Sequence, residues 1–122
     1  MKRGELYRIS LGSKTDKKKQ RVYVIVSRQE LVESAYSTII CAPVYTNYEG
    51  LSTQVPVSVE EGLKHPSAIR CDELISILKS QLTDYVGMLS EIKLAELGQA
   101  LLIALGIDSV FYAQTIKRIK QP

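Results

Sequence analysis

The chain has 122 residues, a formal net charge of +3 and a sequence pI of about 8.9. This length is typical of one domain rather than two. Hydrophobic residues make up 45% of the chain and charged residues 24%, which excludes a largely disordered protein. The slight positive charge permits a polyanionic partner without requiring one. We expect a single folded domain over residues 1–122.

The short strands predicted in the amino-terminal part are separated by turn signals and by one polar, lysine-rich loop at residues 12–20. Residues 28–36 are expected to form a short helical turn or an irregular excursion before the next strand. Pro43 is expected to end or bulge the third strand, and Pro56 to place the fourth at a sheet edge, because proline donates no ladder hydrogen bond. This pattern favours a small antiparallel barrel. The five predicted strands cover residues 4–11, 21–27, 37–44, 53–59 and 67–77.

The carboxyl-terminal part changes to a helical period. Ser90 is a predicted N-cap and Gly106 a predicted helix end, and between them four leucines share one face. Gly98 lies inside this helix, which suggests a close backbone approach to the barrel or to a second subunit. Residues 107–122 carry too many apolar side chains for a free tail, so we expect them to dock. The four leucines are Leu94, Leu97, Leu101 and Leu105.

The two cysteines, Cys41 and Cys71, lie in apolar segments and lack the spacing of metal ligands. We interpret them as reduced core thiols of a cytoplasmic protein, with a disulfide as the less favoured alternative. The start "MKRGELYRIS" lacks the apolar run of a signal peptide, and "LLIALGI" is too short to span a bilayer. The sequence therefore predicts a cytoplasmic protein without a membrane partner.

The segment "SAIRCDELISI" is predicted to place Arg70 and Asp72 on one face of a strand, with Ile69 and Cys71 on the other. Two interpretations are open. An exposed pair of opposite charges is common on strand surfaces and contributes only ~0 to 1 kcal/mol. Alternatively, the pair marks a site of phosphate chemistry.

The order of several segments resembles the MazF/PemK/Kid toxins over residues 1–107. The segments are "MKRGELY", "GSKTDKKKQRVYVIVS", "TIICAPVYTN", "STQVPV", "AIRCDELISI", "YVGMLS" and "LAELGQALLIALGI". The resemblance implies a CcdB-like fold, mainly β with α: a small SH3-like antiparallel barrel with a carboxyl-terminal helix. It also implies a homodimeric endoribonuclease toxin that needs no metal or other cofactor. Such toxins cut single-stranded RNA at short sequences and are neutralised by a cognate antitoxin protein.

The tripeptide Arg70, Cys71 and Asp72 matches an R-C-D element that carries the proposed catalytic residues in the PemK/Kid branch. The resemblance implies that Asp72 takes the proton of the RNA 2′-OH. Arg70 would stabilise the charge that develops on the phosphorane, because guanidinium scarcely gives up its own proton. The products would be a 2′,3′-cyclic phosphate and a free 5′-OH. The acid that protonates the leaving 5′ oxygen is left open.

A second arginine, Arg21, matches the start of the family's Arg-Pro-Val strand, although Val22 replaces the proline. The threonine of MazF-type members falls on Tyr45, with Thr46 one position later. Tyr45 is interpreted as an RNA-binding residue that stacks on a base or donates its hydroxyl. A shift of one residue near Pro43 would instead present Thr46 as the catalytic threonine.

Several other residues have an open interpretation. Lys17, Lys18 and Lys19 are either a solvated charge run or contacts to RNA phosphates. Glu73 stands where many family members have glutamine, which would alter base recognition. His65 precedes a proline in a turn and matches no catalytic position of the family, so we expect a surface histidine.

Two other functions are weighed against the toxin nuclease. The first is a CcdB-like binding protein that poisons a DNA topoisomerase without catalysis, against which Arg70, Asp72 and Arg21 argue. The second is an RNA-binding barrel that has lost its activity, which the departures at Tyr45 and in the lysine loop leave open.

Overall fold

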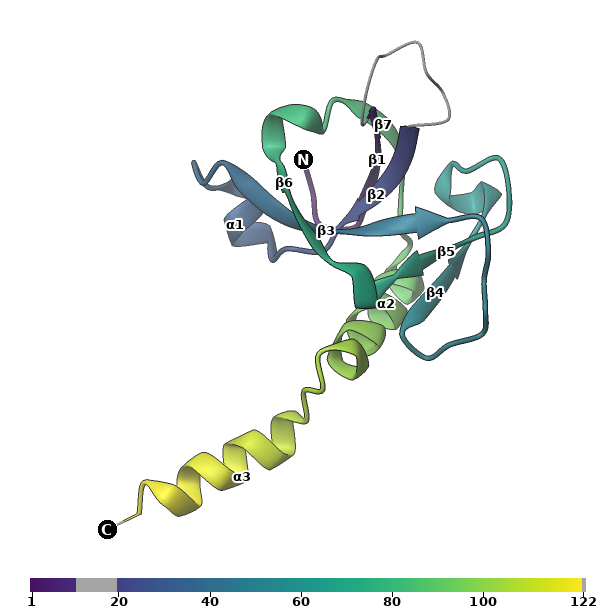
Figure 1. The fold of residues 1–122 in the computed structure, drawn as a ribbon. Coiled ribbons are helices and arrows are strands. Elements are labelled where there is room, and N and C mark those ends of the chain that lie inside the picture. Colours follow the sequence, from purple (N-terminus) through teal and green to yellow (C-terminus); the bar gives the residue numbers. More distant parts are fainter. Residues whose placement is uncertain (11–19, 122) are drawn as a thin grey trace.

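The computed structural model describes residues 1–10 and 20–121, and within them the fold is a curled antiparallel sheet with three helices (Figure 1). The predicted barrel with a carboxyl-terminal helix is thereby confirmed. The predicted contacts of Lys17, Lys18 and Lys19 lie outside the described residues. The strands are β1 (Glu5–Ser10), β2 (Gln20–Ile25), β3 (Thr38–Tyr45), β4 (Gln54–Val57), β5 (Ser67–Arg70), β6 (Ile75–Leu78) and β7 (Asp84–Met88). The helices are α1 (Gln29–Glu33), α2 (Glu91–Ala104) and α3 (Ser109–Ile119).

The sheet has the strand order β4-β5-β3-β2-β1-β7, and β6 pairs with β3. The long strand β3 runs along β2 on one side and changes partner on the other, from β6 at Cys41 to β5 at Val44. Pro43 lies in this interval and pairs in regular register with Tyr23. The prediction that Pro43 ends or bulges the strand was wrong, because its missing N–H falls where β3 exchanges one neighbour for the other.

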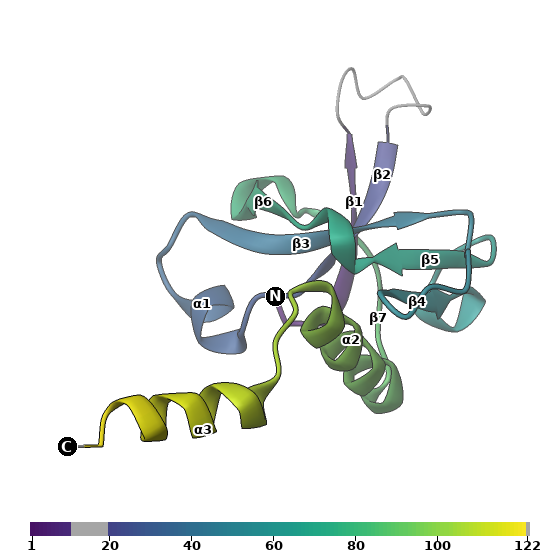
Figure 2. The same ribbon diagram turned by 60° about the horizontal axis from the view of Figure 1, so that its bottom comes forward.

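Apolar side chains form two cores on the two faces of the sheet. One core lies beneath α2 and includes Leu6, Ile69, Cys71 and Leu97. The other lies on the face of the sheet that carries α1 and includes Cys41. Both cysteines are buried and free, as predicted. The views in Figures 1 and 2 agree that α2 lies across the sheet near β4 and β5.

The predicted fifth strand is broken in the structure. β5 ends at Arg70, a 3₁₀ turn covers Cys71–Glu73, and β6 begins at Ile75. The single long strand over residues 67–77 was therefore a wrong prediction. The side chain of Cys71 turns into the core beneath α2, and its N–H bonds to the carbonyl of Thr53 at 3.1 Å, so the chain bends there.

Helix α2 begins and ends where its capping residues predict. The Ser90 hydroxyl accepts a hydrogen bond from the Lys93 N–H at 3.3 Å, and Gly106 adopts φ +66° after the last turn. Leu97 is fully buried, whereas Leu105 is exposed. A Cβ built on Gly98 meets no atom within 4 Å, so Gly98 makes no close approach to this chain's own barrel.

Two glycines allow a loop to lie directly against strand β7. Gly62 adopts φ +91°, and an added Cβ there would lie 2.2 Å from the carbonyl oxygen of Val86. An added Cβ on Gly87 would lie 2.0 Å from the carbonyl oxygen of Glu61. No side chain fits between these two backbone segments. The contact holds residues 58–66, between β4 and β5, against the rest of the sheet.

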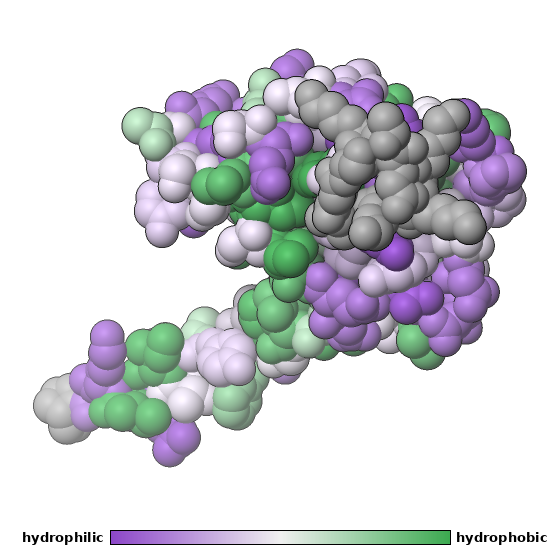
Figure 3. All heavy atoms as spheres, turned by 45° about the horizontal axis from the view of Figure 1, so that its top comes forward, coloured by the Kyte–Doolittle hydropathy of each residue, from purple (hydrophilic) through white to green (hydrophobic). Residues whose placement is uncertain are grey.

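Helix α3 extends away from the barrel and has no buried residue (Figures 1 and 2). We expected residues 107–122 to dock, and the barrel of the same chain is one surface on which they could do so. The described residues of this segment do not dock there. Figure 3 shows apolar atoms on this helix and at its junction with α2. The exposed apolar residues of this region are Leu102, Ile103, Leu105, Ile107, Val110, Phe111, Tyr112, Ile116 and Ile119.

Within residues 1–10 and 20–121, no single helix is long and apolar enough to cross a membrane. α2 and α3 reach that length and composition only when they are taken together, and a bend of 52° separates them.

Candidate active site

The centre of the candidate site is Tyr45, the last residue of β3. The guanidinium carbons of Arg21 and Arg70 lie 3.9 Å and 4.0 Å from the centroid of its ring. β2 and β5 pair with β3 on opposite sides of Val44, which faces Val22 and Ile69, the neighbours of Arg21 and Arg70 in the sequence. The sheet therefore joins three residues that are far apart in the sequence into one cationic group around an aromatic ring.

Two carboxylates hold the guanidinium of Arg70. One Nη atom lies 3.3 Å from a Glu73 oxygen, and the other lies 3.3 Å from a Glu49 oxygen. The Tyr45 hydroxyl donates to the second oxygen of Glu73 at 3.0 Å. Glu73 thus fixes both the arginine and the tyrosine. Glu49 was not identified from the sequence, because it lies in a loop whose pattern carries no signal for an ion pair.

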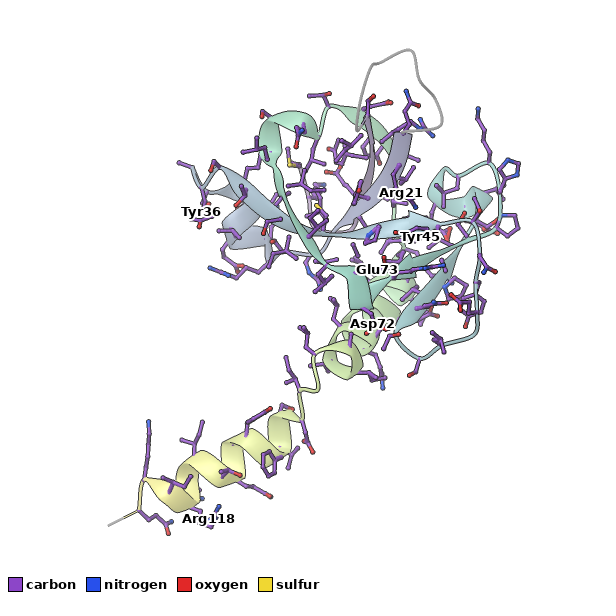
Figure 4. All side chains as sticks on the ribbon, viewed as in Figure 1. Arg21, Tyr36, Tyr45, Asp72, Glu73 and Arg118 are labelled. Atoms are coloured by element: carbon purple, nitrogen blue, oxygen red, sulfur yellow. The ribbon has the colours of Figure 1, made fainter. Side chains whose placement is uncertain are left out.

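Asp72 does not pair with Arg70 in the structure, contrary to the prediction that both lie on one strand face. Arg70 ends β5, whereas Asp72 belongs to the turn after it, and turn residues do not alternate between two faces. The Thr53 hydroxyl donates to Asp72 at 2.6 Å, and the Asp72 side chain is exposed. Figure 4 shows Arg21, Tyr45, Glu73 and Asp72 as a continuous series across one end of the sheet.

A pocket of about 350 Å³ opens beside Arg21 and Tyr45. Thr46 lines it, so the structure brings the predicted threonine and Arg21 to one cavity. Lys64 and His65 contribute from the loop that Gly62 anchors. His65 is exposed, as predicted, but it lies at this pocket rather than away from the site. The lining residues are Arg8, Gln20, Arg21, Val22, Val44, Tyr45, Thr46, Leu63, Lys64, His65 and Ser67.

Cys71 lies between the two predicted catalytic residues in the sequence, but its thiol is unsuited to act as a nucleophile. Burial raises the pKa of Cys71 to about 11, and the neighbouring Asp72 adds to the shift. Burial likewise raises the pKa of Cys41 to about 12. Both thiols remain protonated near neutral pH, so Cys71 serves packing while its neighbours face solvent.

In the part of the chain that the structure describes, no three His, Cys, Asp or Glu side chains gather where they could hold a metal ion. The two guanidinium groups beside Tyr45 can bind a phosphodiester directly through charge-assisted hydrogen bonds, in competition with the carboxylates of Glu49 and Glu73 at Arg70. Independence from metal remains a prediction.

Comparison with known proteins agrees with the fold and with the order of its segments. Residues 2–105 match a family described as "PemK-like, MazF-like toxin of type II toxin-antitoxin system". A curated relative, Endoribonuclease MazF3 of Mycobacterium tuberculosis, is 31% identical over 87 residues, which cover 71% of this chain and 84% of the relative.

Solved structures share the same architecture. Mycobacterium tuberculosis toxin MazF-mt6 superposes with a TM-score of 0.73 and 27% identity over 85% of this chain and 98% of the other. A mycobacterial endoribonuclease solved in complex with its cognate antitoxin superposes with a TM-score of 0.75 and 22% identity. That alignment covers 88% of this chain and 97% of the other, and at this identity it supports the fold alone. Since the family match spans most of the sequence, the chain belongs to the PemK-like, MazF-like toxins of type II toxin-antitoxin systems.

Proposed function

We propose that this toxin is an endoribonuclease that cleaves single-stranded RNA, as the name of its curated relative suggests. The observation that carries the proposal is the placement of Arg21 and Arg70 at 3.9 Å and 4.0 Å from the Tyr45 ring. Guanidinium binds phosphate, and a guanidinium plane stacks on an unpaired base as an aromatic ring does. Both groups that a single RNA strand requires are therefore present at one end of the sheet. This arrangement also argues against the noncatalytic, topoisomerase-poisoning alternative.

The proposed reaction is attack of a 2′-OH on the adjacent phosphate. Asp72, which is exposed and held by Thr53, takes the proton of the 2′-OH. Arg70 and Arg21 stabilise the negative charge of the phosphorane. The bond to the 5′ oxygen then breaks, which leaves a 2′,3′-cyclic phosphate and a free 5′-OH. Thr46, which shares the pocket with Arg21, adds a hydroxyl donor to the same phosphate.

The biological setting that we propose follows the family. An antitoxin covers the Arg21, Tyr45 and Arg70 group and blocks RNA, and two copies of the chain form a homodimer in the cytoplasm. An acidic, partly disordered antitoxin segment suits a long cationic surface, because a flexible chain can follow it.

Alanine substitutions at the R-C-D element test the proposal. We expect Arg70→Ala and Asp72→Ala each to slow cleavage of a long RNA by at least ~10², because a charge-stabilising donor and a general base each contribute about that much. Arg70→Lys restores little, since an ammonium lacks the planar two-point contact with phosphate. Rates are measured in EDTA, and the ends of the products are identified by mass spectrometry.

Circular dichroism of each variant controls for folding. Asp72 is exposed and Arg70 is only partly buried, so both substitutions should leave the fold intact. Cleavage at the wild-type rate by a folded double variant, Arg70→Ala with Asp72→Ala, would contradict the assigned roles. Binding of RNA by the wild-type chain without any cleavage would instead favour the inactive barrel.

A further inference from the structure

The proposed reaction lacks a group that protonates the leaving 5′ oxygen. We propose that His65 is this general acid, an inference that rests on the proposed function. His65 is the chain's single histidine, and it lines the pocket of about 350 Å³ together with Arg21, Tyr45 and Thr46. A pocket of this size lies at the lower end of the range for small-ligand sites, and Arg21 and His65 both line it.

The backbone of His65 is held in place from both sides. Upstream, Gly62 lies against the Val86 carbonyl, and the Leu63 N–H bonds to the Ser58 carbonyl at 3.2 Å. Downstream, the buried Ser67 hydroxyl donates to the His65 carbonyl at 2.9 Å. The loop therefore presents the imidazole from an anchored backbone at the edge of the pocket.

The other proton donors around Tyr45 are unsuited to this step. Arg21 and Arg70 keep their protons, because guanidinium is too weak an acid. The Tyr45 hydroxyl already donates to Glu73 at 3.0 Å. Imidazolium is the side-chain acid that ordinarily gives up a proton near neutral pH, which is the requirement for a general acid.

The charged and titratable groups that share the pocket with His65, among the described residues, are Arg8, Arg21, Tyr45 and Lys64. Arg8 also pairs with Asp84 at 3.7 Å. The surroundings of the imidazole are thus cationic, and the phosphates of bound RNA balance this charge. The pocket combines an anion site with a proton donor, whereas the carboxylates lie on the Arg70 side of the tyrosine.

The step balances in atoms and charge. The 2′ oxygen forms a bond to phosphorus, and its proton passes to the carboxylate. The bond between phosphorus and the 5′ oxygen breaks, and that oxygen takes the proton of the His65 imidazolium. The products are the cyclic phosphate, a 5′-OH, a protonated Asp72 carboxyl and a neutral imidazole. Before the next cycle the carboxyl releases its proton to solvent and the imidazole takes one up.

The test compares two versions of one short RNA whose cleavage site has first been mapped in a long RNA. One version carries the natural 5′ oxygen at that site, and the other carries a bridging 5′ sulfur. A thiolate leaves without a proton because thiols are far more acidic than alcohols. We expect His65→Gln to slow cleavage of the oxygen substrate by ~10² or more, and that of the sulfur substrate by less than ~5-fold.

Lys64→Gln is the matched control, since it removes a neighbouring cation of the pocket and keeps the imidazole. It should weaken cleavage of both substrates by the same factor. If His65→Gln cleaves the oxygen substrate within ~3-fold of wild type, or slows both substrates equally, His65 is not the general acid. These outcomes leave the nuclease proposal intact, whereas a wild-type chain that cleaves neither substrate refutes both.

Discussion

Tyr45 shows what a single residue contributes beyond its place in a motif. The resemblance left open whether Tyr45 or Thr46 takes the position of the family's threonine. Both residues line the same pocket, and the tyrosine ring also contacts both arginines. Tyr45 therefore supplies the ring that contacts the arginines, and Thr46 supplies an aliphatic hydroxyl next to it.

Substitutions at these two residues separate the ring from the hydroxyl. Tyr45→Phe keeps the ring between the arginines and loses only the hydrogen bond to Glu73, so we expect less than a ~10-fold loss in kcat/KM. Tyr45→Leu removes the ring that both guanidinium groups contact, so the arginines lose their position and KM should rise by ~10-fold or more. Thr46→Val should lower kcat if its hydroxyl contacts the reacting phosphate. Steady-state kinetics on a short RNA distinguish these cases, and equal effects of Tyr45→Phe and Tyr45→Leu would show that the ring does not position the arginines.

At the scale of elements, the strands and α2 were predictable because their signals are local. β-branched runs mark the strands, and Ser90 and Gly106 mark the helix ends. The break after Arg70 was not predictable, since "SAIRCDELISI" alternates like one strand and only the burial of Cys71 under α2 bends it. The ion pair of Glu49 with Arg70 likewise depends on a loop conformation that the pairing of β4 with β5 sets.

A pair of glycine substitutions measures how tightly the loop before β5 is held. Gly87→Ala places a Cβ 2.0 Å from the Glu61 carbonyl oxygen, so we expect a loss of at least ~2 kcal/mol in the free energy of unfolding. Gly98→Ala lies in α2 with open space around it and should gain ~0.5 to 1 kcal/mol. Urea denaturation of both variants gives these values. If Gly98→Ala instead lowers the free energy of unfolding of the assembled protein, a second subunit approaches α2 at this residue.

At the scale of the whole molecule, the chain consists of a toxin barrel and an appended helix. The family match ends at residue 105, and α3 begins at Ser109. The apolar side chains of α3 are not buried against the barrel of the same chain. Neither the family pattern nor periodicity predicts where such a helix lies, because its position depends on the surface that covers it.

Deletion of residues 108–122 tests the independence of this helix. We expect the shortened chain to keep the urea midpoint of the full chain at low concentration, because α3 contributes no buried residue. Light scattering reports the mass of both chains, and the homodimer proposal predicts twice 13.6 kDa for the full chain. A clear fall in the midpoint, or a dimer lost on deletion, would place α3 in an interface.

The two carboxylates that pair with Arg70 affect how strongly any ligand binds there. Glu49 and Glu73 already neutralise this guanidinium, each at 3.3 Å, so an arriving phosphate must replace a carboxylate rather than fill an empty site. Binding is then an exchange of one anion for another, and its net free energy is smaller than the contact itself suggests. Fewer counterions are released in such an exchange, so RNA binding at this arginine should depend less on salt than binding at a free one. The same exchange applies to any acidic segment of an antitoxin.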